Sequence, residues 1–164
     1  MSRSRSVAMM ALIFFGMSIF LVGNAVAGRE ATESVTGSWY STSKVIAVGE
    51  DFMYGAYEGF SVWVGDTGKE MLHGASLHNV GQWHVEKGSY GETGGVVWNL
   101  PNGDKIYLKY FASEASKGTI TAVGGTGKCA GIEGSGEYTV HPATPSIEGL
   151  WQGLIKMKFH YKLP

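Results

Sequence analysis

The sequence predicts an all-β protein, a single antiparallel β-barrel of about eight strands. Apolar and polar residues alternate with a period of two between turn signals, and almost no segment has the period of a helix. Glycine makes up 25 of the 164 residues, and that density disfavours long helices. Long strands joined by short turns in chain order favour a closed barrel over a sandwich, because closure removes exposed strand edges.

Residues 1–27 have the pattern of a signal peptide. Two arginines precede an uncharged apolar run that ends at Val22, and an Ala-Val-Ala tripeptide then offers a cleavage site before Gly28. An N-terminal membrane anchor is the alternative, because the apolar run approaches the length of a membrane span. We expect a barrel domain over 28–164, a secreted or periplasmic location, and no stable membrane insertion after cleavage.

The strands are expected in meander order, each bounded by glycine-rich or polar turns. They span residues 37–48, 52–64, 70–80, 82–90, 94–100, 105–111, 117–123, 136–141 and 150–163. The strongest hairpin signal is the Asn102-Gly103 pair between two alternating apolar runs. In the last strand apolar residues alternate with lysine, histidine and glutamine, which predicts a sheet with one face in water.

Charge and cysteine content exclude several classes of protein. The chain has 13 basic and 14 acidic residues, which argues against electrostatic binding of nucleic acid. Its single cysteine, Cys129, excludes an intramolecular disulfide framework and a zinc site of several cysteines. The pattern contains no recognisable glycosidase pair, Ser-His-Asp order or metal motif, and this disfavours hydrolysis.

A glycine-rich segment interrupts the alternation at residues 123–138. A phosphate-binding Walker motif fails there, because Ala122 stands where its first glycine should be and Cys129 follows the lysine. A relaxed dinucleotide fingerprint begins at Gly125, but further glycines follow where that motif needs a helix. Neither nucleotide-binding interpretation is retained.

The run Gly124–Gly136 resembles the pattern G-G-T-G-K-[YF]-x-G-x-x-G-x-G of the allene oxide cyclase and dirigent superfamily. The chain departs from it at Cys129, where an aromatic residue is usual. The resemblance implies a bacterial-type secreted member with an eight-stranded, calycin-like antiparallel barrel, in which this run is a short turn between two late strands. Members of the superfamily include cyclases and proteins that steer the coupling of phenoxy radicals, and both dimers and trimers are known. A homo-oligomer is therefore one expectation.

Glu58 is the first candidate catalytic residue. It shares the parity of the apolar residues in 52–64, so we expect it to point into the barrel, where a buried carboxylate can act as a general acid or base. The alternative is a bulge at Gly55 or Gly59 that returns Glu58 to water. Tyr54, on the same face, is the second catalytic candidate.

Aromatic residues are expected to line the barrel cavity and bind the ligand, with packing in the core as the alternative for three of them, Tyr54, Trp98 and Tyr107. The expected ligand-binding residues are Phe52, Tyr54, Phe60, Trp98 and Tyr107. His73, His78 and His84 lie close in sequence, but their parity favours ordinary histidines over a metal site. We expect Cys129 to be a buried small residue, with a nucleophile as the alternative.

Three functions follow from these expectations. The first is an exported protein that binds a small hydrophobic or aromatic molecule in its cavity, without metal or cofactor. The second is a cofactor-free cyclase or isomerase acting on a small hydrophobic substrate, as the resemblance implies. The third is a structural or interaction barrel with a packed interior.

Overall fold

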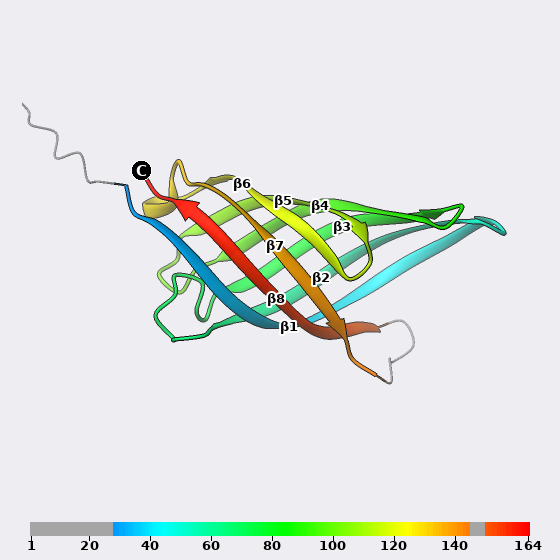
Figure 1. Ribbon diagram of the computed structural model, residues 1–164, viewed down its shortest axis with the longest axis horizontal. Helices are drawn as coiled ribbons and strands as arrows, with labels where there is room; N and C mark the ends of the chain where they lie inside the picture. The colour runs from blue at the N-terminus through cyan, green and yellow to red at the C-terminus, as the bar shows by residue number, and fades with distance from the viewer. Residues whose placement is uncertain (1–27, 145–149) are drawn as a thin grey trace, which may run out of the picture.

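The computed structural model describes residues 28–144 and 150–164, so the expected signal peptide over 1–27 lies outside the described residues. The described chain forms a closed antiparallel barrel in which each strand pairs with the next and β8 closes onto β1 (Figure 1). The strands are β1 Glu30–Gly49, β2 Phe52–Gly65, β3 Ser76–Glu86, β4 Ser89–Asn99, β5 Lys105–Glu114, β6 Lys117–Gly125, β7 Glu133–Pro142 and β8 Leu150–Lys162. A one-turn 3-10 helix, η1 Gly127–Cys129, lies between β6 and β7. The predicted fold class is confirmed.

Several strand boundaries differ from those predicted. The segment 70–75 is a loop rather than the start of a strand, and Gly74 within it adopts a left-handed φ of 79°. Gly81 was expected to lie between two strands and Gly94 to begin one, but the two glycines pair with each other in the interior of β3 and β4. A glycine in a strand interior leaves space beside the backbone. At both glycines the Tyr110 side chain fills this space.

The barrel has a packed end and an open end. At the packed end the segment 66–75 inserts Leu72, which is fully buried, and the connection between β6 and β7 buries Cys129 and Ile132. Between them lies a cluster of aromatic rings that meet edge to face or stacked, with centroids 5.0 to 6.3 Å apart. Its members are Trp63, Trp98, Phe159 and Tyr161.

At the opposite end the long hairpins β1–β2 and β3–β4 extend past the other strands (Figure 1). The two chain termini of the described barrel lie at the packed end, where the first residues of β1 pair with the last residues of β8. Within 28–144 and 150–164, no helix has both the length and the apolar character needed to cross a membrane.

Candidate ligand-binding site

A cavity of about 390 Å³ occupies the half of the barrel next to the long hairpins. This volume lies within the range of small-molecule sites, roughly 300 to 1,000 Å³. Residues of all eight strands line it, because each strand directs alternate side chains inward. The barrel is therefore filled by side chains at one end and hollow at the other.

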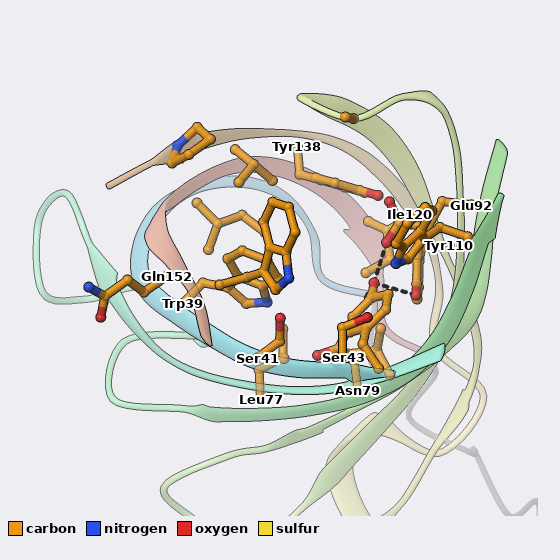
Figure 2. Close-up of a pocket in the computed structure, with 18 of the residues that line it drawn as sticks. Trp39, Ser41, Ser43, Leu77, Asn79, Glu92, Tyr110, Ile120, Tyr138 and Gln152 are labelled. Atoms are coloured by element: carbon orange, nitrogen blue, oxygen red, sulfur yellow. Dashed lines mark hydrogen bonds between the residues drawn. The ribbon is translucent and has the colours of Figure 1, made fainter. Parts of the chain in front are cut away.

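The cavity wall is rich in aromatic side chains. Four of the five tryptophans line it: Trp39, Trp63, Trp83 and Trp151. Four tyrosines join them: Tyr57, Tyr90, Tyr110 and Tyr138. Figure 2 shows the Trp39 ring across the lumen from Tyr110 and Glu92. One wall thus offers apolar ring faces, and the facing wall carries the hydroxyl and carboxyl groups.

A hydrogen-bonded cluster of polar side chains forms that second wall. Tyr57 donates from its hydroxyl to Glu92 Oε1, and Tyr90 donates to Glu92 Oε2 at 2.5 Å. The hydroxyls of Tyr57 and Tyr110 lie 2.6 Å apart, and Asn79 Nδ2 donates to the Tyr57 hydroxyl at 3.4 Å. The cluster joins β2, β3, β4 and β5 inside the barrel (Figure 2).

The phenols of this cluster are strongly held in their neutral form. Burial, together with the negative charge of Glu92, raises the pKa of Tyr57 far above its usual range. Burial and the hydrogen bond to Glu92 raise the pKa of Tyr90 in the same way. Tyr138, which meets the Tyr110 ring edge to face, also has its pKa raised, first by burial and then by Glu92. These hydroxyls remain proton donors at physiological pH.

Glu58 and Tyr54, the two predicted catalytic residues, lie on the outer surface instead of in the cavity. The expectation that Glu58 points inward is wrong: its side chain is half exposed, and Oε1 lies 2.7 Å from Nε2 of His78 on β3. Tyr54 is 41% exposed and donates to Glu86 at 2.5 Å. The β2–β3 ladder pairs every residue from Phe52 to Val62, so no bulge at either glycine explains this orientation.

The physical reason is that the odd-numbered residues of β2 point inward, whereas Tyr54 and Glu58 are even-numbered. Its inward positions include Gly55 and Gly59, which accommodate large neighbours. A Cβ at Gly55 would lie 2.2 Å from the Trp83 indole, and one at Gly59 would lie 2.4 Å from Asn79 Oδ1. The even-numbered apolar residues of β2, Phe52 and Phe60 among them, therefore face outward, whereas Met53 and Trp63 of the other parity line the cavity. This orientation is the reverse of the one that the sequence suggested.

None of the five predicted ligand-binding residues lines the cavity. Phe60 stacks on His78 at the outer surface, with ring centroids 4.9 Å apart, and Phe52 and Tyr54 share its parity on β2. Tyr107 lies on the outer face of β5 and is 38% exposed. Trp98 does point inward, but it is fully buried in the packed end. It is therefore a core residue, which was the alternative expectation for it.

The histidines and Cys129 have ordinary structural surroundings. Residues 28–144 and 150–164 contain no group of three or more potential metal-binding side chains. His73 accepts a hydrogen bond from the backbone of Gly65 at 3.3 Å, and His84 lies beside the Tyr54 ring. Cys129 is 1% exposed with its thiol 4.0 Å from the Met71 sulfur, and burial raises its pKa. A buried thiol of raised pKa is a packing residue rather than a nucleophile.

Sequence reasoning missed the polar cluster. Glu92 and Tyr90 share the parity of Val96 and Trp98 on β4, so the strand pattern could have placed them inside. The position of Tyr110 could be predicted only from other strands, because the paired glycines Gly81 and Gly94 leave room for its side chain.

Comparison with known proteins supports the fold. No protein-family model matches the sequence, and no curated protein matches it. Solved structures do: the pterocarpan synthase dirigent protein GePTS1 superimposes with a TM-score of 0.55 at 10% identity, covering 83% of this chain and 92% of its own. The pterocarpan synthase dirigent protein PsPTS1 gives a TM-score of 0.50 at 10% identity, covering 81% and 96%. The chain therefore has a dirigent-like barrel fold.

Proposed function

We propose that the protein binds a small aromatic or hydrophobic molecule in the open half of the barrel without transforming it. The observation that carries this proposal is the cavity of about 390 Å³, whose wall combines four tryptophans with a compact set of hydrogen-bonding groups. Apolar pockets with a few convergent polar groups are the usual form of small-molecule sites. The pattern of residues 1–27 supports export of this binding protein from the cytoplasm.

A titration with N-phenyl-1-naphthylamine, a neutral aromatic dye that fluoresces in apolar surroundings, tests this proposal. We expect saturable binding, accompanied by a change in tryptophan emission because most of the tryptophans line the site. Val140→Trp places a large ring at the cavity wall and should weaken binding by about tenfold or more, which corresponds to about 1.4 kcal/mol.

The matched control is Val123→Trp, which makes the same change at an exposed outer position of β6. It should leave the affinity for the dye within about twofold of the wild type, because the new ring points away from the lumen. No saturable binding by the wild type, or equal weakening in both variants, would contradict binding in the cavity.

A cyclase or isomerase is the second candidate, and the hydrogen-bonded cluster of Glu92 with Tyr57 favours it. A carboxylate joined to phenols can exchange a proton with a bound substrate. The superimposed dirigent proteins are pterocarpan synthases, and this supports an enzyme on the same fold. Incubation of the protein with a small-molecule extract of its native cells should then convert one compound into an isomer, with changed chromatographic retention and unchanged mass. Unchanged retention would leave only the binding function.

A further inference from the structure

The charge of the cavity wall is unbalanced. Glu92 is the only residue with a carboxyl side chain among those that line the cavity, and no lysine, arginine or histidine of the described residues lines it. The strand lysines lie on the outer face; Lys109 of β5 and Lys158 of β8 are both exposed. Among the described residues, the lumen therefore presents one acidic side chain and no cationic one.

The partners of Glu92 are all neutral. Tyr57 and Tyr90 donate to its two oxygens, and Tyr110 and Asn79 contact Tyr57. Hydrogen bonds from neutral hydroxyls solvate an ionised carboxylate but leave its charge in place. An ionised group in a site of low dielectric is stabilised most by an opposite charge, which nothing in the described wall supplies.

The remaining wall also favours a positive charge. The faces of tryptophan and tyrosine rings attract cations, most strongly where water is excluded from the contact. Here Trp39 and Trp63 line the same lumen as the four tyrosines and Glu92. An anionic ligand would meet both the carboxylate and the negative ring faces, so the wall opposes it.

We propose that the cavity selects an organic cation, an amine or quaternary ammonium group carried on an aromatic or aliphatic body, with the positive charge near Glu92. This inference rests on the proposed binding function, which it narrows to a chemical class of ligand. The apolar wall around Trp39 holds the body of the ligand, and the Glu92 cluster neutralises its charge.

A pair of isosteric probes tests the inference in the wild-type protein. 3-Hydroxyphenyltrimethylammonium and 3-tert-butylphenol have nearly the same shape and the same hydroxyl, and they differ in one positive charge. Titration by calorimetry or tryptophan fluorescence should give a Kd about tenfold or more lower for the cation. Equal or tighter binding of 3-tert-butylphenol would overturn the inference while leaving the proposed function intact. Failure of both probes to bind would overturn the proposed function as well.

Two variants assign the preference to Glu92. Glu92→Gln removes the charge and keeps the shape, so the two probes should then bind within about threefold of each other. Glu137→Gln makes the same change on the exposed outer face of β7 and should retain the wild-type preference for the cation. Retention of the preference in a folded Glu92→Gln protein would overturn the role of this carboxylate. Should that variant fail to fold, the ratio of the two wild-type Kd values still decides the selectivity.

Discussion

Tyr110 illustrates how single residues shape the cavity. Its ring crosses β4 and places its hydroxyl beside Gly81 of β3, where a Cβ would lie only 1.7 Å from the hydroxyl oxygen. A Cβ at Gly94 would lie 2.5 Å from the same atom. These two glycines allow the Tyr110 hydroxyl to reach Tyr57, so the polar cluster depends on residues that carry no side chain.

Gly81→Ala should therefore destabilise the protein by about 1 to 3 kcal/mol, because the new methyl displaces a buried ring. The free energy of unfolding in urea measures the effect. Gly95→Ala is the matched control: no atom lies within 4 Å of a Cβ there, and its stability should change by less than about 0.5 kcal/mol. Equal effects of the two substitutions would contradict the packing role of Gly81.

At the scale of the elements, strand existence was predictable and strand orientation was not. Alternation gave the order of the strands and the hairpin at Asn102-Gly103, since both are local features of the sequence. Which face of β2 points inward depends on the space that its glycines, Gly55 and Gly59, leave for Trp83 and Asn79 of β3. Periodicity within one strand does not record such a contact between strands. The outward face of β2 is rich in apolar residues, so the sequence pattern predicted that this face points inward. For that reason the predicted site residues of β2 lie on the outer surface.

The segment 66–75 is held in the packed end by a buried carboxylate. Glu33 of β1 is 5% exposed and accepts hydrogen bonds from the backbone N–H groups of Met71 and Leu72, at 2.7 and 3.1 Å. It also accepts the hydroxyl proton of Tyr161 at 2.8 Å. One side chain thus fixes the segment that buries Leu72, and it joins that segment to both the first and the last strand.

Glu33→Gln should lower the free energy of unfolding by about 1.5 to 3 kcal/mol, the usual range for hydrogen bonds to a charged group. The side-chain amide nitrogen of the new glutamine is itself a donor, so it cannot accept the hydrogen bonds that a Glu33 oxygen accepts from backbone N–H groups or from the Tyr161 hydroxyl. Trypsin should also cut faster after Lys69, which lies in the same segment. Glu30→Gln on the exposed face of β1, where Glu30 lies 3.3 Å from His160, should change both readouts little. Unaltered cleavage in Glu33→Gln would argue against the anchoring role.

For the whole molecule, the buried tyrosines link the integrity of the barrel to high pH. Burial is the largest cause of the raised pKa of Tyr57, Tyr110, Tyr138 and Tyr161. An unfolded chain would ionise these phenols near pH 10, whereas the folded chain keeps their protons. Above pH 10, unfolding therefore releases protons from these phenols. Their contribution to the free energy of unfolding is fully present below pH 10 and falls as the pH rises above it.

Tyr138→Phe isolates one of these tyrosines, because the described residues give its hydroxyl no hydrogen bond to lose, while its ring lines the cavity beside Tyr110. Above pH 10 the free energy of unfolding of the wild type should fall more steeply than that of Tyr138→Phe, by about 1.4 kcal/mol per pH unit. Urea unfolding at several values between pH 8 and pH 11.5, with tyrosinate absorbance recorded in parallel, measures both slopes. Below pH 9 the two proteins should differ by a constant amount, which serves as the internal control. Parallel curves across the whole range would show that the Tyr138 proton is not retained by the folded barrel.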